Sequence, residues 1–328
     1  MRVLITGGAG YIGATIGSAC QDAGHEVVVL DDLSAGRREF TEGREFFEGD
    51  VGDVVLLDKV LATGIDAVVH CAAKIIVPES VADPIGYYRT NVSKSIDLAE
   101  TLVRHGVRRV VFSSSASIYA STDDFLVTET SPFGPQSPYA RTKAMMEWVL
   151  EDVARTGALQ VLPLRYFNPI GADPQLRTGQ QVADPTHVLG RIMNADLNNE
   201  PFTITGCDWP TPDGSGLRDY IHVWDLARAH VAALENIDQV CADQPYVPIN
   251  IGTGKPSTVR DLVQAYQEAT GHDLDVREGP ARPGDVAGVY ASADHAADLL
   301  NWRAERTLTD GIRDALAWQE VRPQRLGY

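Results

Sequence analysis

The sequence predicts an α/β fold built on a doubly wound parallel sheet, accompanied by a second, smaller domain. Three observations support this prediction. Short β-branched strands alternate with helix-like segments in the first half of the chain, a glycine-rich turn joins the first strand to the first helix, and the pattern loosens after Asn168. Strands that alternate with helices form parallel sheets that are covered on both faces.

The elements of the first half follow each other in the order that such a sheet requires. A short apolar strand at residues 2–6 leads into a helical pattern over 11–23, which ends at Gly24. A second apolar strand follows at 26–30 and is closed by two aspartates. Further apolar runs and helical spacings predict strands at 67–70, 109–113 and 160–164, and helices at 92–105 and 140–155.

The second half is more irregular. Gly, Pro, Asp and Thr concentrate in residues 172–186 and 206–217, which predicts long loops. A helix is expected at 223–234, a strand at 247–251, and helices at 259–270 and 310–320. We therefore predict a first domain of residues 1–167 plus about 219–251, and a second of about 168–218 and 252–328.

The bulk composition excludes several classes of function. The 328 residues carry a formal net charge of −17, which argues against a nucleic-acid partner, because phosphate binding needs clustered Lys and Arg. The four cysteines are far apart and the histidines form no HxxxH pair, so we expect neither a metal site nor a disulfide framework. We see no signal peptide and no apolar run of roughly 18–20 residues, so we expect a cytoplasmic protein without a membrane partner.

The glycine-rich turn has the spacing of a dinucleotide site. Residues 6–13 read TGGAGYIG and place Gly7, Gly10 and Gly13 between the first strand and the first helix. Glycines there allow a tight turn and let backbone N–H groups approach a pyrophosphate at the positive end of a helix. Asp31 ends the second strand, where a carboxylate accepts the ribose hydroxyls of NAD and repels the 2′-phosphate of NADP. The pattern predicts a Rossmann-type NAD-binding domain, in which Asp50 is either a ligand of the adenine amino group or an ordinary loop carboxylate.

A second pattern predicts catalysis. Tyr139 and Lys143 form a YxxxK pair, and on a helix these two side chains lie on one face, one turn apart. A phenol is a poor base at neutral pH, but a nearby ammonium favours the phenolate. Three serines at 113–115 end the preceding apolar strand, where a hydroxyl can hydrogen-bond a reacting oxygen. The order of glycine turn, strand-end serine and YxxxK favours a catalytic site over an exposed Tyr–Lys pair on a solvated helix face.

Several further motifs support a resemblance to a known family. Beside TGGAGYIG, they are HCAA at 70–73, FSSSA at 112–116, PQSPY at 135–139, RYFNPIG at 165–171, PTPDG at 210–214, RDYIHV at 218–223 and RPGD at 282–285. With these motifs the chain resembles, nearly from end to end, the extended short-chain dehydrogenase/reductases and, within them, the UDP-glucose/UDP-galactose 4-epimerases. The combination is far more specific than the fold, which does not identify a function.

The resemblance implies a role for each site residue. Tyr139 would be the catalytic base, Lys143 its electrostatic partner, and Ser115 the hydroxyl that assists at the sugar oxygen. The implied NAD ligands are Gly7, Gly10, Tyr11, Ile12, Gly13, Asp31, Asp32, Ser34, Asp50, Val51, Cys71, Ala72, Ala73, Lys74, Asn91, Ser113, Tyr139, Lys143 and Phe167. The implied ligands of the UDP-sugar are Ser115, Tyr139, Asn168, His187, Thr203, Thr205, Arg218, Tyr220, Arg282, Asp285 and Val289.

The resemblance also implies the reaction. Tyr139 would take the proton of the sugar 4-hydroxyl while C4 gives a hydride to NAD, the 4-keto sugar would turn within the pocket, and the hydride would return to its opposite face. The first domain would then bind NAD and the second the UDP-sugar. The family suggests a homodimer, for which apolar positions within 92–102 and 145–149 are available, although packing against the sheet explains the same residues equally well.

Three alternative functions differ from this interpretation in the residues that they usually require. A nucleotide-sugar 4,6-dehydratase usually has Asp-Glu directly after the strand-end hydroxyl, where this chain has Ala116 and Ser117. A non-catalytic NAD-binding scaffold usually loses the Tyr or the Lys, and both are present. A 4-epimerase of another UDP-sugar, an N-acetylhexosamine or a pentose, stays open, because Val289 is of intermediate size at the position that gates the N-acetyl group in the family.

The chain departs from the family pattern at a few positions. Ala120 replaces the usual Gly after Tyr119, and Trp209 stands where Tyr is common. Two isoleucines follow Lys74, which leaves open which backbone segment contacts the pyrophosphate. The catalytic set is unaffected.

Overall fold

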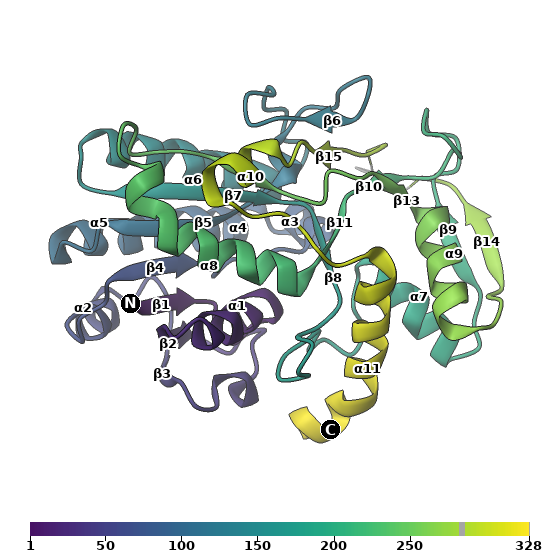
Figure 1. Cartoon of the computed structure of the whole chain (residues 1–328), viewed down its shortest axis with the longest axis horizontal. Coiled ribbons are helices and arrows are strands. Elements are labelled where there is room, and N and C mark those ends of the chain that lie inside the picture. Colours follow the sequence, from purple (N-terminus) through teal and green to yellow (C-terminus); the bar gives the residue numbers. More distant parts are fainter. Residues whose placement is uncertain (282–285, 328) are drawn as a thin grey trace.

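A computed structural model, which describes residues 1–281 and 286–327, has a seven-stranded parallel sheet as its largest element (Figure 1). Across the sheet the strands follow the order β3-β2-β1-β4-β5-β7-β12. Their bounds are β1 Arg2–Thr6, β2 Glu26–Asp31, β3 Glu45–Glu48, β4 Ala67–His70, β5 Arg109–Ser115, β7 Gln160–Tyr166 and β12 Ile249–Ile251. The predicted doubly wound parallel sheet is thereby confirmed.

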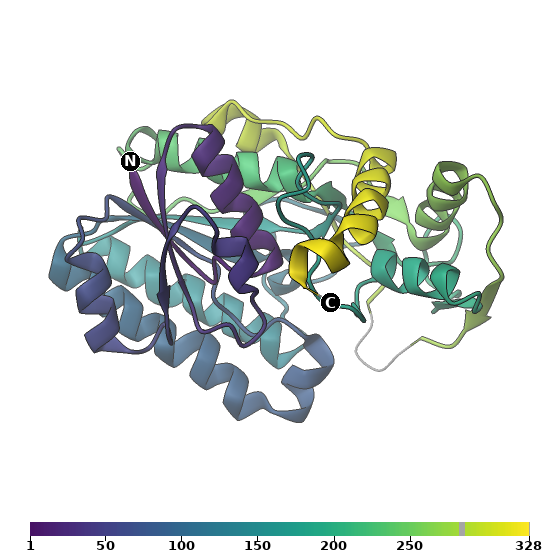
Figure 2. The ribbon, with the colours of Figure 1, turned by 90° about the horizontal axis from the view of Figure 1, so that it is seen from below.

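Helices cover both faces of this sheet, as Figure 2 shows. On one face pack α1 Tyr11–Asp22, α8 Val223–Val240 and α10 Asp294–Leu300, and on the other α2 Val54–Leu61, α5 Lys94–His105 and α6 Pro138–Arg155. Neighbouring residues of a strand point to opposite faces, so Val3 and Ile5 belong to the first apolar core and Leu4 to the second. Burial on both faces explains why the strands are continuous apolar runs.

The strand order reverses direction between β1 and β4, which are hydrogen-bonded neighbours. In open α/β sheets ligands bind outside the carboxyl ends of the strands at this point. The loops that follow β1 and β4 therefore face the expected ligand crevice. Short elements line the same end of the sheet: α3 Val77–Ala82, α4 Pro84–Tyr88, a π-helical turn at Arg89–Ser93, a 3₁₀ turn at Ala116–Ile118, β8 Asn168–Ile170 and β11 Tyr220–His222.

A second group of elements has its own apolar core and lies beside the sheet (Figure 1). It contains α7 Val188–Leu197, α9 Val259–Thr270, β9 Phe202–Thr205, β14 Val276–Gly279 and α11 Leu308–Leu326. Ile192, Leu262 and Tyr266 are almost completely buried in this core. Because α8 and β12 come between these segments in the chain, the two groups interleave in sequence. The remaining short elements are a 3₁₀ turn at Arg38–Thr41, β6 Leu126–Val127, β10 Leu217–Arg218, β13 Ser257–Thr258 and β15 Tyr290–Ala291.

Two of these helices begin with a reciprocal cap. At α9 the Thr258 hydroxyl accepts from the Asp261 N–H while the Asp261 carboxylate accepts from the Thr258 N–H, and Thr307 and Asp310 repeat the arrangement at α11. Such caps satisfy backbone donors that a helix start leaves unpaired. They explain why α11 begins at Leu308, two residues before the predicted start. Within the described residues no helix is long and apolar enough to cross a membrane.

Candidate functional site

The glycine-rich turn after β1 is packed too tightly for side chains at Gly7 and Gly13, two of the three glycines of the GxxGxxG pattern. Gly7 has a φ of +70°, and a Cβ there would lie 2.7 Å from the backbone nitrogen of Ala72. A Cβ on Gly13 would lie 2.2 Å from the carbonyl oxygen of Gly7. At Gly10, which precedes α1, a Cβ would meet only the Gly7 carbonyl oxygen, at 3.4 Å. The turn is thus closed toward the protein and open at Gly10, which fits a pyrophosphate at the start of a helix.

The two candidate ribose and adenine ligands lie at the carboxyl end of the sheet. The carboxylate of Asp31, which is 8% exposed, accepts hydrogen bonds from the N–H groups of Ala9 (2.9 Å) and Leu33 (2.8 Å). It is fixed beside the glycine turn, and burial raises its pKa. Asp50 forms an ion pair with Lys94, whose side-chain hydrogen bond helps to lower the pKa of Asp50 against the effect of burial. The predicted Asp32 and Ser34 lie on the exposed loop after β2, where the Asp32 carboxylate accepts from both the N–H and the hydroxyl of Ser34.

Asn91 fixes the loop that follows β4. Its carboxamide accepts from the N–H of Lys74 at 2.8 Å and donates to the carbonyl of Lys74 at 2.9 Å. It also donates to the hydroxyl of Thr142 on α6 at 3.1 Å. Asn91 lies in the π-helical turn before α5, and such turns recur at functional sites. The structure therefore gives the Asn91 side chain a role in fixing the loop after β4 against α6.

Ser115, Tyr139 and Lys143 meet at the carboxyl end of β5. Ser137 caps α6 by accepting from the Ala140 N–H at 3.2 Å, which places Tyr139 in the first helical turn. Burial raises the pKa of the Tyr139 phenol above its ordinary value, and a hydrogen bond with the Ser115 hydroxyl offsets part of this rise. One turn further, the Lys143 ammonium donates to the Ser113 carbonyl oxygen at 2.7 Å. The structure thus brings together the three residues that the sequence predicted as catalytic.

The Lys143 side chain is only 4% exposed, and its surroundings set its charge. Burial lowers the pKa of Lys143 to about 8, while Cys71 and Glu147 raise it. Cys71 lies on the loop after β4, with its Sγ 3.0 Å from the Ser113 hydroxyl, and burial raises the pKa of that thiol to about 11. At neutral pH, therefore, Lys143 is cationic beside a neutral thiol.

The candidate substrate ligands that the structure describes come from several separate elements. Arg218 is the last residue of β10, and its guanidinium donates to the carbonyl oxygens of Leu217 (2.6 Å) and Ala287 (3.1 Å). The buried Tyr220 hydroxyl makes no hydrogen bond within the described part of the chain. Val289 packs against the apolar cluster formed by Ala116, Ile118, Tyr119, Val127, Ala144, Phe167 and Ala291, which begins directly after Ser115 in the chain. Asn168 is exposed at the start of β8, Thr203 and Thr205 lie on β9, and Arg282 and Asp285 lie outside the described residues.

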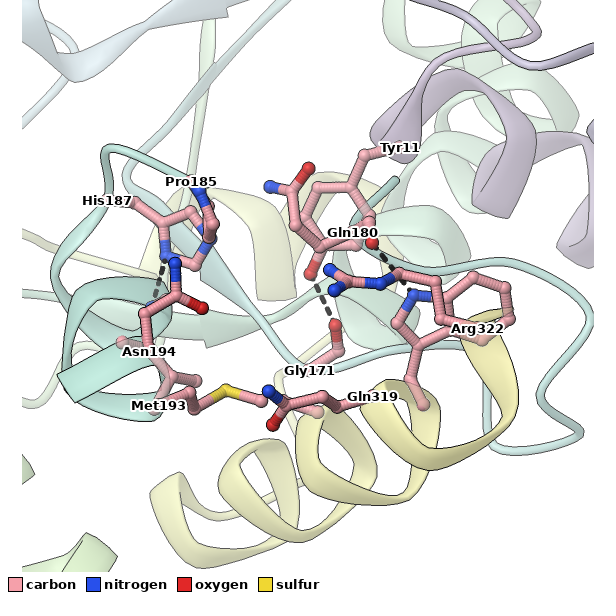
Figure 3. A pocket seen from close by; sticks show the side chains of 13 residues that line it. Tyr11, Gly171, Gln180, Pro185, His187, Met193, Asn194, Gln319 and Arg322 are labelled. Carbon is pink, nitrogen blue, oxygen red and sulfur yellow. Dashed lines mark hydrogen bonds between the residues drawn. The ribbon is translucent and has the colours of Figure 1, made fainter. Parts of the chain in front are cut away.

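Two predicted residues line a separate pocket, shown in Figure 3. Tyr11 from α1 donates its hydroxyl to the Gly171 carbonyl oxygen at 2.6 Å. His187 caps α7 by accepting from the Gly190 N–H at 3.2 Å. Residues of α7 and α11 complete the lining, which is formed by Tyr11, Gly171, Gln180, Pro185, His187, Leu189, Gly190, Met193, Asn194, Ala315, Trp318, Gln319 and Arg322. The predicted catalytic residues do not line this pocket, which Tyr11 lines from α1 and His187 from the start of α7.

Sequence reasoning missed two buried carboxylates. Asp219 accepts from the N–H groups of Thr253, Gly254 and Ala291, and so ties three segments together beside Arg218. Glu147 lies two helical turns beyond Tyr139 and pairs with Arg165. Asp219 lies within the motif RDYIHV, and Glu147 lies four residues after the YxxxK motif. The available signal for Glu147 was its spacing, because it follows Tyr139 and Lys143 at intervals of four residues on one helix.

Comparison with known proteins identifies the family. The model of the NAD dependent epimerase/dehydratase family matches residues 3–252. A UDP-glucose 4-epimerase of Azospirillum brasilense is 41% identical over 330 residues, which cover 99% of this chain and 94% of that protein. A crystal structure of UDP-glucose-4-epimerase from Stenotrophomonas maltophila, with bound NAD and formylated UDP-arabinopyranose, has a TM-score of 0.93 and 38% identity, covering 99% of both chains. One from Bifidobacterium longum, in complex with NAD+ and UDP, has a TM-score of 0.92 and 34% identity, covering 99% of this chain and 100% of that chain.

Proposed function

The chain belongs to the NAD-dependent epimerase/dehydratase family, and from that premise we propose that it interconverts UDP-galactose and UDP-glucose by inverting C4 of the hexose. The observation that carries this proposal is the meeting of Ser115, Tyr139 and Lys143 at the carboxyl end of β5. This site lies near the glycine turn, because β5 follows β4 and β1 in the sheet. The full-length relatives with the same activity support it.

NAD fits the residues at the switch point of the sheet. The open face of Gly10 and the first turn of α1 would hold the pyrophosphate, and Asp31 would hold a ribose. When bound, NAD supplies the hydride acceptor for C4 of the sugar and the donor that restores it. The protein residues do the rest: they orient the reacting groups, exclude water and move one proton.

Tyr139 is the residue that we assign to the proton. Its phenol oxygen would take the proton of the sugar 4-hydroxyl and later return it to the same oxygen on the inverted carbon. The Ser115 hydroxyl, already hydrogen-bonded to Tyr139, would also bond the sugar oxygen. The Lys143 ammonium, held on the Ser113 carbonyl, would favour the phenolate. These roles require Tyr139 and Lys143 to lie one helical turn apart, as they do on α6.

The second group of elements is proposed to hold the UDP part of the substrate. The Arg218 guanidinium can bind a diphosphate, since its planar fork matches phosphate oxygens. We propose the domain division predicted from the sequence, with residues 1–167 and about 219–251 binding NAD and the rest binding the UDP-sugar. UDP would be held firmly and the hexose loosely, because the 4-keto sugar must turn before reduction. The four cysteines are free, which supports the proposal of a cytoplasmic enzyme.

Incubation of the purified protein with UDP-galactose, without added nucleotide, tests the activity. Chromatography should show UDP-glucose without net reduction of NAD. If no sugar turns over even with added NAD, the alternative of a non-catalytic NAD-binding scaffold replaces the proposal. Turnover of a UDP-N-acetylhexosamine or a UDP-pentose alone would support the other open alternative, a 4-epimerase of another UDP-sugar.

The size of residue 289 should change the range of substrates. Val289 lies beside the apolar cluster next to Ser115, so a glycine there enlarges this wall and a tyrosine fills it. We expect Val289→Gly to raise the kcat/KM for UDP-N-acetylglucosamine relative to UDP-galactose roughly tenfold, since a change of one or a few carbons in a pocket has effects of this size. Val289→Tyr should lower the ratio. Equal ratios in the three proteins would exclude Val289 as a gate.

A homodimer through α5 and α6 is also part of the proposal. These helices cover one face of the sheet, yet they expose Ile96, Val103, Met145 and Trp148 to solvent. Trp148 is 52% exposed, and a large exposed aromatic residue among apolar neighbours is typical of an interface. We expect Trp148→Glu to convert dimers into monomers in sedimentation equilibrium. Leu197→Glu, at an apolar residue of α7 that is more exposed than Trp148, should leave the dimer intact, and a dimer that survives Trp148→Glu would exclude this surface.

A further inference from the structure

A buried ion pair lies directly behind the catalytic residues. Arg165 on β7 donates three hydrogen bonds to the carboxylate of Glu147 on α6, from Nη2 at 2.6 Å and from Nε at 3.0 and 3.1 Å. The Glu147 side chain is 0% exposed and that of Arg165 is 4% exposed. The pair is therefore removed from water, and it is neutral as a whole.

Glu147 connects every element that carries a reacting group. Tyr139, Lys143 and Glu147 follow each other at intervals of four residues, so they lie along one face of α6. The carboxylate of Glu147 also accepts from the hydroxyl of Ser114, which lies between the two serines that contact Lys143 and Tyr139. The side chain of Glu147 thus joins α6 to the carboxyl end of β5.

Arg165 extends these connections to the opposite side. Its Nη1 donates to the Tyr119 hydroxyl and to the Glu129 carbonyl oxygen, both at 2.9 Å. Its guanidinium lies over the rings of Tyr119 and Phe133, at 5.3 and 5.0 Å from their centroids. The segment that follows Ser115 is therefore anchored through Arg165 to Glu147.

Stability alone does not account for this arrangement. Removing two charges from water opposes folding, and apolar residues of similar volume often replace a buried ion pair without loss of stability. A buried pair that fixes several elements in one geometry contributes specificity of packing instead of stability, because it excludes alternative packings. Here the geometry that it fixes is that of β5, α6 and the segment after Ser115.

We propose that Glu147 is a positioning residue of the catalytic site, which holds α6 against the end of β5 and supports the positive charge of Lys143. The expected effect of Glu147 on turnover rests on the proposed epimerase function.

The groups that face Lys143 come from three elements. They are the Phe112 ring (4.9 Å from Nζ to the centroid) and the Ser113 carbonyl on β5, His70 and Cys71 at the end of β4, and Tyr139 and Glu147 on its own helix. His70 is neutral, because burial lowers its pKa to about 3, and Cys71 is a neutral thiol. Glu147 is then the anionic side chain among them.

Lysine NMR tests this coupling without any use of the activity. The chain has five lysines, Lys59, Lys74, Lys94, Lys143 and Lys255, so a protein labelled with ¹³C-lysine gives few Cε–Hε signals, and Lys143→Met identifies that of Lys143. In the wild type the signal should titrate at about pH 8. In Glu147→Gln it should titrate roughly one pH unit lower, the size of effect that a nearby opposite charge has. The matched control is Glu151→Gln, the same change one turn further along α6, where the carboxylate pairs with Arg155 at the surface.

A second arm follows turnover and separates the inference from the proposed function. Glu147→Gln should lose activity at a lower pH than the wild type on the alkaline side, with an unchanged KM for UDP-galactose, whereas Glu151→Gln should match the wild type. If Glu147→Gln does not fold because Arg165 is left unpaired, Glu147→Gln/Arg165→Met replaces it under the same criteria. A Lys143 titration that is unchanged in the Glu147 variant overturns the inference. An inactive wild type with a shifted titration overturns the proposed function and retains the coupling.

Discussion

Replacement of Tyr139 by phenylalanine is expected to lower kcat by about 10²- to 10⁴-fold, the contribution of a positioned acid–base group. The change removes one hydroxyl, which hydrogen-bonds Ser115, and leaves the buried ring in place. The fold and the binding of NAD should therefore persist. Measurement of kcat by conversion of UDP-galactose, together with the NAD content of the purified variant, tests this expectation.

Tyr266→Phe provides the control for that variant. Tyr266 is also buried, and its hydroxyl donates to Asp196 at 2.8 Å in the second group of elements, away from the catalytic residues. Loss of this hydrogen bond should lower the free energy of unfolding by about 1 kcal/mol and leave kcat unchanged. If Tyr139→Phe retains the kcat of the Tyr266→Phe control, Tyr139 does not move the proton.

The two glycines Gly10 and Gly13 should respond differently to alanine. A Cβ on Gly13 would lie 2.2 Å from the Gly7 carbonyl oxygen, so Gly13→Ala must displace the turn and lower both stability and NAD binding. At Gly10, whose φ is −85°, a Cβ meets the same oxygen at 3.4 Å and the turn accommodates it. If the open face of Gly10 holds the pyrophosphate, the methyl group occupies ligand space there.

We therefore expect Gly10→Ala to keep its melting temperature and to bind NAD roughly 10- to 100-fold more weakly, the effect of about 1–3 kcal/mol of overpacking. The comparison needs thermal unfolding and the NAD content of each purified variant. A Gly10→Ala protein with a full load of NAD would contradict the placement of the pyrophosphate. A Gly10→Ala protein that loses NAD only because it unfolds would also contradict this placement.

The sheet was predictable from the sequence because most of its strands are buried on both faces. β1, β2 and β4 are continuous apolar runs, and the sequence places them within one residue of their observed bounds. β3 was missed, because Glu45–Glu48 is a half-exposed edge strand with two charged ends. α2 was missed for the opposite reason: Val54–Leu61 is a short and nearly continuous apolar run, which has no clear helical period.

The candidate site was predictable where its residues lie in local motifs. Gly7, Gly10 and Gly13 follow one strand, and Tyr139 and Lys143 lie on one helix, so their spacing alone brings them together. The long-range partners were not predictable in this way. Glu147 reads as a charged residue on an amphipathic helix, and its burial depends on Arg165, which lies on a strand 18 positions further along the chain.

The most direct test of the central claim is the fate of the hydrogen on C4 of the sugar. UDP-galactose that carries deuterium at C4 is converted by the protein in ordinary water, and the product is examined by NMR. We expect UDP-glucose with the deuterium retained at C4, because the hydride is removed and returned within one active site, with Tyr139 moving only the proton on oxygen. Loss of the deuterium to solvent would contradict the account, since it would require inversion of C4 by proton abstraction from carbon.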